Sequence, residues 1–351
     1  MQLRVKLQVV ETSTILREGA GQSHTDPPKE PKMPAVTPEN PLVLPRVHVT
    51  DPIASHRLTK RVVPAVRAIE GEGFEVRRPF PGALSLRDVD PFLLLDQMGG
   101  KELAPGEAKG TPWHPHRGFE TVTYMMDGTL EHKDSTGGGG IITDGGTQWM
   151  TAGAGILHIE QPDEKLVMKG GVLHGVQLWV NLPAKEKMTA AKYQDITPES
   201  VKILTNRDGD AIIRLIAGDL GEHKGPGITF TPITYLHATL MPGAQMVLPW
   251  RTDFSAMVYS LNGTGFVGGD RAPLGENQLA ILDFGDTIVV EASPRQDSKA
   301  QYLDVLVLGG LPIREPIAHY GPFVMNTREE ILTAMEDYQK GRMGQIPATH
   351  F

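Results

Sequence analysis

Two histidines, His114 and His116, are separated by one residue in the stretch HPHRGFETVTYMMDGT, residues 114–129. Along a β-strand, residues i and i+2 lie on the same face, so both imidazoles can reach one metal ion. The stretch LHIE contains a second pair with the same spacing, His158 and Glu160. Three neutral imidazoles and one carboxylate form a ligand set that suits Fe(II), Mn(II), Ni(II), Cu(II) or Zn(II). The two pairs together therefore predict a transition-metal site.

Glu120 is a second candidate for the carboxylate ligand. It follows His116 by four residues and lies on the same strand face if the strand stays regular. A carboxylate at either position, Glu120 or Glu160, could also act as a general base toward a substrate. The spacing alone does not choose between the two carboxylates.

An internal repeat places these residues in the first of two related units. The stretch TVTYMMDGT (121–129) matches AMVYSLNGT (256–264), and both contain a two-residue hairpin turn, Asp-Gly or Asn-Gly. Downstream, QWMTAGAGILHIE (148–160) aligns without gaps with QLAILDFGDTIVV (278–290). The chain is therefore predicted to contain two related β units in tandem.

The second unit lacks all four candidate ligands. The residues that replace them in the alignment carry no imidazole and no carboxylate: Pro249 and Arg251 for the first pair, Ile288 and Val290 for the second. The hairpin glycines and the apolar pattern persist in both units. Because the four residues are lost as a set, we expect one metal-binding unit and one metal-free unit.

The elements that must position these ligands are short strands. From about residue 60 the chain consists of short apolar runs, such as FLLLD, VQLWVNL and TIVVEA, separated by Gly, Pro, Asn and Asp. Many short strands at close spacing indicate an all-β barrel or sandwich. One helix is expected near the carboxyl terminus. Thr327 and Glu330 form a capping box at its start, and Gly341 marks its expected end.

Composition excludes several classes of protein and site. The 351 residues contain no cysteine, so disulfides, thiolate metal sites and cysteine nucleophiles are excluded. A formal net charge of −8 argues against general binding to nucleic acid or anionic membranes. No apolar run is long enough to span a membrane, and no signal peptide is evident, so a cytoplasmic location is expected. Residues 21–46 contain seven prolines and are expected to be disordered.

The residues around both pairs resemble the pirin family of the cupin superfamily. The matching stretches are TPWHPHRGFETVTYMMDGTLEHKDSTG and GTQWMTAGAGILHIEQP in the first unit, together with DPFLLLDQMGG, HGVQLWVNLPAKEKM and HYGPFVMNTREEILTAMEDYQKGRMG. The resemblance extends from about residue 60 to 345. The proline-rich amino-terminal extension has no counterpart in the family.

The resemblance implies an all-β fold of two tandem cupin (jelly-roll type) β-barrels with a short C-terminal helix and a disordered N-terminal extension. The corresponding boundaries are 1–50 for the extension, 51–195 for a metal-binding barrel, 196–310 for a metal-free barrel and 311–351 for a segment with a docking helix. Pirins bind their metal, usually iron, in the amino-terminal barrel. The ligands implied here are His114, His116, His158 and Glu160, with Glu120 beside the site.

The resemblance also implies the function classes. Some pirins cleave flavonols as quercetin 2,3-dioxygenases, and others bind transcription factors as coregulators that respond to the oxidation state of iron. The expected partners are therefore a flavonol-like aromatic molecule or a protein, without direct nucleic-acid binding or membrane contact, and a monomer is the simplest state. A coregulator could also occur in the nucleus of a eukaryote. A non-catalytic metal-binding cupin is the third alternative.

The sequence also contains further histidines and several large apolar side chains near the predicted site. His132, His174, His237 and His319 have no histidine two residues away and are expected to be structural, with His174 the best candidate for a neighbour of the site. Apolar side chains could line a slot for a flat aromatic substrate, and the candidates are Trp113, Phe119, Met125 and Trp149.

Overall fold

The computed structural model describes residues 37–346 except residues 39, 50–52, 72 and 297–300. β-Strand is the main secondary structure of the described chain, which also contains two α-helices, α1 (Glu164–Lys169) and α2 (Arg328–Gln339), and three short 3-10 helices, η1 (Pro41–Val43), η2 (Ala184–Glu186) and η3 (Pro198–Ser200). No helix in the described ranges is both long and apolar enough to cross a membrane. Most of the predicted disordered extension, residues 1–36, lies outside the described residues.

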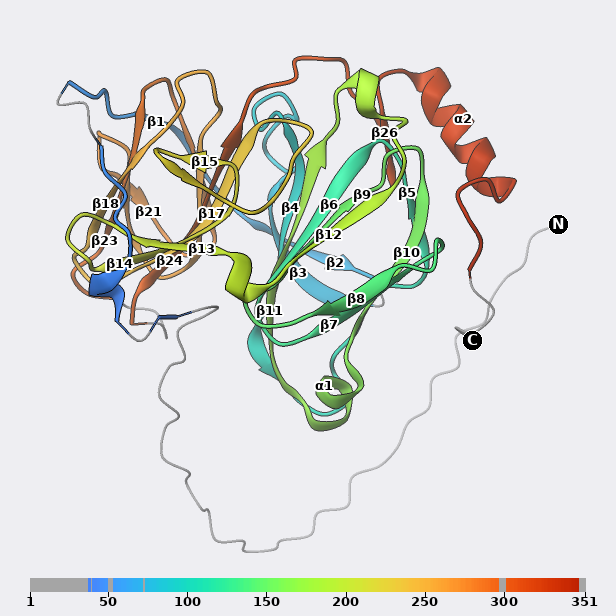
Figure 1. Ribbon diagram of the computed structural model, residues 1–351, viewed down its shortest axis with the longest axis horizontal. Helices are drawn as coiled ribbons and strands as arrows, with labels where there is room; N and C mark the ends of the chain where they lie inside the picture. Colours follow the sequence, from blue (N-terminus) through green and yellow to red (C-terminus); the bar gives the residue numbers. More distant parts are fainter. Residues whose placement is uncertain (1–36, 39, 50–52, 72, 297–300, 347–351) are drawn as a thin grey trace, which may run out of the picture. The chain divides into compact units, whose positions relative to one another are not determined.

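The first barrel consists of two antiparallel sheets (Figure 1). One has the order β12-β9-β6-β11-β4-β3-β2, and the other, which carries the candidate ligands, has the order β5-β10-β7-β8. The strands are β2 (Val66–Glu70), β3 (Phe74–Phe80), β4 (Phe92–Leu103), β5 (His114–His116), β6 (Phe119–Asp127), β7 (Leu130–Asp134), β8 (Gly139–Ile142), β9 (Thr147–Thr151), β10 (Ile156–Pro162), β11 (Gly171–Asn181) and β12 (Lys192–Ile196).

The second barrel repeats this arrangement. Its sheets have the orders β1-β22-β19-β24-β17-β14-β13 and β18-β23-β20-β21. The strands are β1 (Thr59–Pro64), β13 (Lys202–Thr205), β14 (Ala211–Ala217), β17 (Ile233–Leu240), β18 (Gln245–Pro249), β19 (Met257–Asn262), β20 (Gly265–Val267), β21 (Ala272–Leu274), β22 (Gln278–Leu282), β23 (Thr287–Ala292) and β24 (Leu303–Gly310). Two small hairpins complete the chain, β15 (Asp219–Leu220) with β16 (His223–Lys224), and β25 (Ala318–Tyr320) with β26 (Phe323–Met325). The all-β fold with two barrels is confirmed.

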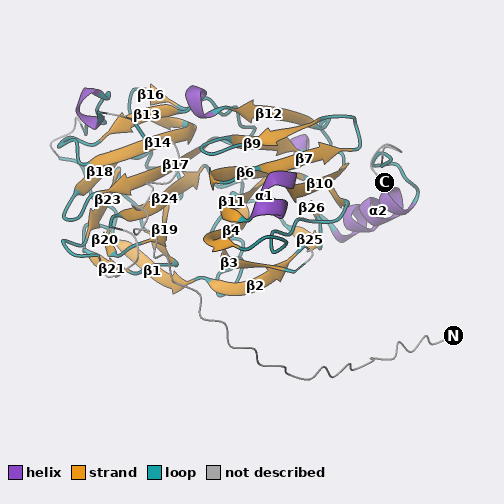
Figure 2. Cartoon of the chain, turned by 90° about the horizontal axis from the view of Figure 1, so that it is seen from below, coloured by secondary structure: helices purple, strands orange, loops and turns teal. Residues whose placement is uncertain are grey.

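A segment near each end of the described chain packs on the barrel that lies farther away in the sequence. Strand β1 pairs with β22 of the second barrel, with Val62 opposite Ala280, while the next strand, β2, lies in the first barrel (Figure 2). Conversely, the segment after β24 returns to the first barrel, where Phe323 forms a β-bridge with Arg117. Residues 59–64 therefore belong to the second barrel although the predicted boundary at 51 assigns them to the first.

The end of the predicted extension is also packed. Val47 is buried in the core of the second barrel, and its backbone N–H donates to the carbonyl of Thr205. The carbonyl of Pro45 accepts from the N–H of Thr205 in turn. The prediction of disorder up to residue 50 is therefore wrong for this part, because one apolar side chain and two backbone hydrogen bonds hold it on the barrel.

The structure shifts the repeat alignment by one residue at the histidine pair. In the first barrel His158 pairs with His114, and in the second the equivalent Ile288 pairs with Leu248. The structural counterparts of His114 and His116 are therefore Leu248 and Trp250 rather than Pro249 and Arg251. Leu248, Trp250, Ile288 and Val290 all lie in one hydrophobic core cluster. The second barrel fills the equivalent positions with apolar side chains.

Candidate metal centre

Three histidines converge on the inner face of the first barrel. His114 lies directly opposite His158 on the neighbouring strand β10, and His116 lies opposite Ile156. The ring centroids are 4.7 Å apart for His114 and His116, 4.2 Å for His114 and His158, and 4.8 Å for His116 and His158. One nitrogen from each ring lies within 4.8 Å of the others. The three rings are therefore a candidate site for one metal ion.

Two of the three histidines, His114 and His158, are arranged for coordination by Nε2, whereas the buried nitrogen of His116 without a partner among the described residues is Nδ1. His114 Nδ1 lies 2.8 Å from the carbonyl of Pro112 and donates to it, which leaves Nε2 as the nitrogen with a free lone pair. His158 Nε2 is buried and has no hydrogen-bond partner among the residues that the structure describes. Burial, followed by the charge of His114, holds the pKa values of His116 and His158 well below the usual range. Neutral imidazoles with an unpaired inward nitrogen fit a divalent transition metal.

Glu160 lies beside the three histidines rather than among them. Its side chain shares the inner face of β10 with His158, and its Oε1 accepts a hydrogen bond of 2.7 Å from Thr123 Oγ1. The group of nitrogens within 4.8 Å of one another does not include a carboxylate oxygen of Glu160. The assignment of Glu160 as a fourth ligand therefore stays a prediction.

Glu120 lies on the opposite face of β6. Its Oε1 accepts from Thr151 Oγ1, 2.8 Å away, on the neighbouring strand β9. The reason is a break in the strand: β5 ends at His116, Gly118 has φ +91°, and β6 begins at Phe119. Phe119 thus faces inward, with its ring 5.1 Å from that of His116, and Glu120 faces away. The structure does not bring Glu120 together with the histidines.

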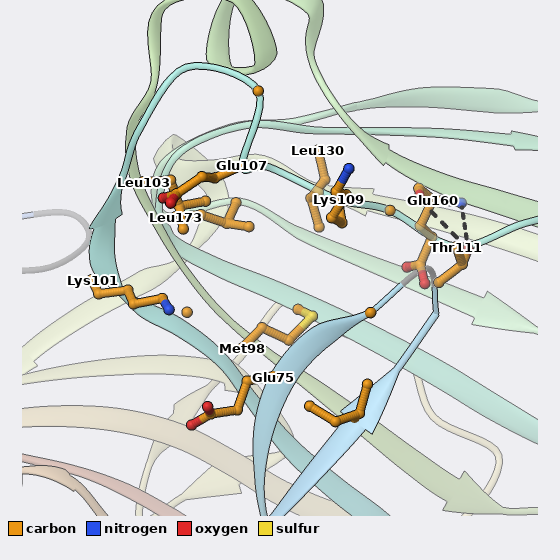
Figure 3. Close-up of a pocket in the computed structure, with 15 residues that line it drawn as sticks. Glu75, Met98, Lys101, Leu103, Glu107, Lys109, Thr111, Leu130, Glu160 and Leu173 are labelled. Atoms are coloured by element: carbon orange, nitrogen blue, oxygen red, sulfur yellow. Dashed lines mark hydrogen bonds between the residues drawn. The ribbon is translucent and has the colours of Figure 1, made fainter. Parts of the chain in front are cut away.

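A cavity of about 490 Å³ borders Glu160 and is shown in Figure 3. Glu160 lies on its wall together with Thr111, whose backbone N–H and hydroxyl are joined to the backbone of Glu160. The apolar residues on the wall are Ile69, Met98, Leu103, Leu130 and Leu173, and the lysines are Lys101 and Lys109.

The proposed aromatic slot is only partly reproduced. Phe119 faces the histidines, and Met125 belongs to a hydrophobic cluster with the cavity residues Met98, Leu130 and Leu173. Trp149 instead lies in the core between the two barrels, because β9 turns this face toward the second barrel. His174 is also remote from the three histidines, since its Nε2 accepts from the amide of Gln97 in that same region.

Sequence reasoning missed His132 as a neighbour of the site. Its Nε2 lies 2.9 Å from His158 Nδ1, and both side chains are buried. The i±2 rule compares residues along one strand, whereas His132 reaches His158 from the adjacent strand β7. The predicted two-residue hairpin at Asp127 and Gly128 is wrong, because β6 pairs with β9 and β11 whereas β7 pairs with β10 and β8 in the other sheet. The local sequence therefore contained no signal for this contact.

Comparison with known proteins covers both barrels. The family model of pirin matches residues 73–180, and that of the pirin C-terminal cupin domain matches residues 235–344. A protein of Pseudomonas aeruginosa named "Putative quercetin 2,3-dioxygenase PA2418" is 42% identical over 274 residues, which are 78% of this chain and 93% of that protein. Human pirin is 38% identical over 278 residues, 78% of this chain and 90% of that protein. The crystal structure of quercetin 2,3-dioxygenase from Acinetobacter baumannii has a TM-score of 0.77 at 36% identity, covering 84% of this chain and 100% of that chain.

Proposed function

The chain belongs to the pirin family, and from this membership and its three-histidine centre we propose that it is a metal-dependent dioxygenase that cleaves flavonols such as quercetin. The observation that carries the proposal is the convergence of the three histidines on the face of β10 that also carries Glu160, a residue on the wall of a cavity with apolar and charged side chains. A volume of about 490 Å³ is in the range of small-molecule sites. The relatives named as quercetin dioxygenases support the same substrate class.

The metal would be held by Nε2 of His114 and His158 and by a ring nitrogen of His116, with Glu160 as the proposed fourth ligand. Fe(II) is the proposed ion, and Zn, Mn, Ni and Cu suit the same ligand set. When bound, the metal supplies a Lewis acid for the flavonol 3-hydroxyl oxygen and exchanges electrons with dioxygen. The inward nitrogens provide the neutral donors that this chemistry needs.

The remaining steps depend on side chains of the chain itself. Glu160 lies on the cavity wall, so its Oε2 can accept the proton of the 3-hydroxyl as general base while Thr123 donates to Oε1. Met98, Leu130 and Leu173 offer apolar surface for the flat rings and exclude water from the reacting carbon. Ring cleavage would then release carbon monoxide.

Anaerobic loading with Fe(II) followed by exposure to air tests the proposal. We expect loss of quercetin absorbance and release of carbon monoxide, both abolished in His158→Ala, which lacks one ligand. The variant should still fold, since the second barrel shows that the scaffold forms around apolar residues at these positions. Stoichiometric metal without turnover in the wild type would contradict the dioxygenase.

The second candidate function is an iron-dependent redox sensor that binds a protein partner, and its support is the similarity to human pirin. The same experiment separates the candidates, because a sensor binds iron without consuming quercetin. Capture of a protein partner in only one oxidation state of the iron would then favour the sensor.

A further inference from the structure

We propose that His132 is a positioning residue that accepts the Nδ1 proton of His158 and so selects the tautomer whose Nε2 binds the metal. The proposal rests on metal binding at the three histidines and is independent of flavonol turnover. The geometry begins with the 2.9 Å separation between His132 Nε2 and His158 Nδ1. The two rings lie nearly perpendicular, with centroids 5.0 Å apart and an interplanar angle of 67°.

One proton between the two rings decides what His158 can do. If His132 Nε2 donates, His158 carries its proton on Nε2 and cannot be a ligand through that atom. If His158 Nδ1 donates, Nε2 has a free lone pair directed toward His114 and His116. Both rings are almost fully buried, at 1% exposure for His132 and 0% for His158, so water does not replace the partner. Metal binding through Nε2 therefore requires that His158 donate this hydrogen bond and that His132 accept it.

The strand register fixes His132 in this place. On β7, His132 lies opposite Glu160 and Asp134 lies opposite His158. His132 therefore faces the same interior as both residues and contacts His158 on the diagonal. His114 has a different partner for its own Nδ1, the backbone carbonyl of Pro112, which no side-chain substitution removes. The hydrogen bond to His158 is the one that a point mutation can test.

The second barrel provides an internal comparison. There Val290 pairs with Val267 as Glu160 pairs with His132 in the first barrel. Val267 is fully buried in the apolar core of that barrel. The counterpart of His132 has thus become apolar together with the counterparts of the ligands. A purely structural histidine on this strand would not need to be lost with the metal site.

The test compares two substitutions at position 132. His132→Leu removes the acceptor, whereas His132→Gln places an amide oxygen near the position of Nε2 and can still accept. We expect competition against a chromophoric chelator, with Ni(II) as probe, to show affinity about 10- to 100-fold weaker for His132→Leu. His132→Gln should restore most of that loss. Tyr193→Phe is the control, because its hydroxyl lies 3.5 Å from His132 Nε2 and is the weaker contact.

Three outcomes would overturn the proposal. They are an unchanged affinity in His132→Leu, an equal loss in the Leu and Gln variants, and an equal loss in Tyr193→Phe. If His132→Leu fails to fold, nitrogen NMR of the zinc-loaded wild type gives the answer directly. It should show the proton on His158 Nδ1, and a proton on His132 Nε2 would contradict the proposal. Wild-type protein that binds no Ni(II) or zinc would remove the basis of the proposed function as well, whereas failure of the variants alone would not.

Discussion

At the residue scale, Glu120 is a buried acid with an unusual protonation. Burial raises the pKa of Glu120 to about 7, against the lowering effects of the hydrogen bond from Thr151, the side chain of Trp149 and the charge of Lys192. Its second oxygen, Oε2, has no hydrogen-bond partner within the described part of the chain. The folded protein therefore holds this proton more tightly than the unfolded chain does. The protein loses stability as the pH rises from 4.5 to about 7.

Glu120→Gln should remove this pH dependence, because an amide does not ionise. A pKa raised from 4.5 to about 7 corresponds to roughly 3 kcal/mol. When the pH is raised from about 4.5 to about 8, we expect the free energy of unfolding of Glu120→Gln to increase by about that amount relative to that of the wild type. Urea unfolding at both pH values measures it. Parallel stability curves for the two proteins would show that Glu120 ionises normally.

At the scale of elements, helix α2 is attached directly behind the ligand strand. Arg117 follows His116 in the chain, and its Nη1 donates to Asp337 Oδ2 of α2 at 2.8 Å while its Nε donates to the carbonyl of Ala154. The Arg117 side chain is only 5% exposed, so the carboxylate of Asp337 is its compensating charge. The helix begins at the predicted capping box of Thr327 and Glu330, and it packs through Ile331.

Asp337→Asn should loosen this attachment, since it leaves the buried guanidinium of Arg117 without a full counter-charge. We expect a loss of about 2 kcal/mol and faster hydrogen exchange across residues 328–339. The matched control is Arg342→Gln, because Arg342 contacts the same carboxylate but is 49% exposed. That variant should cost under about 1 kcal/mol. Equal effects of the two substitutions would contradict the role of Arg117.

Strand faces explain which parts of the site could be predicted from the sequence. The i, i+2 spacing places His114 with His116 within a single strand, so these two needed no knowledge of the fold. Glu120 required the face after Gly118, where a backbone with positive φ reverses the alternation. His132 required the pairing of β7 with β10, which is a contact between strands. The sequence alignment placed the counterparts of His114 and His116 one residue too late, whereas the structural counterparts are Leu248 and Trp250. The residues before that strand carry no signal that fixes the strand register.

At the scale of the whole described molecule, two hydrogen bonds cross between the barrels in a pseudo-symmetric way. Tyr124 of β6 and its repeat counterpart Tyr259 of β19 each reach the other barrel. The hydroxyl of Tyr124 lies 2.9 Å from His237 Nδ1, and that of Tyr259 donates to Gln97 Oε1 at 2.7 Å. Gln97 and His237 occupy equivalent positions in the two barrels. Each pairs with a residue of the neighbouring strand that in turn pairs with the tyrosine of the same barrel.

Substitution of these tyrosines by Phe tests whether the paired hydroxyls hold the barrels together. Tyr124→Phe leaves His237 Nδ1 buried without a donor, and Tyr259→Phe does the same to Gln97 Oε1, so each should cost about 1–3 kcal/mol. Tyr235 is the control in the same core: it is fully buried, and no hydrogen-bond partner for its hydroxyl occurs in the described ranges. Tyr235→Phe removes an unpaired polar group and should leave stability unchanged or raise it. Thermal unfolding of the three variants ranks their stabilities. A loss of stability in Tyr235→Phe as large as in the other two would mean that ring packing, rather than the pair of hydroxyl hydrogen bonds, joins the barrels.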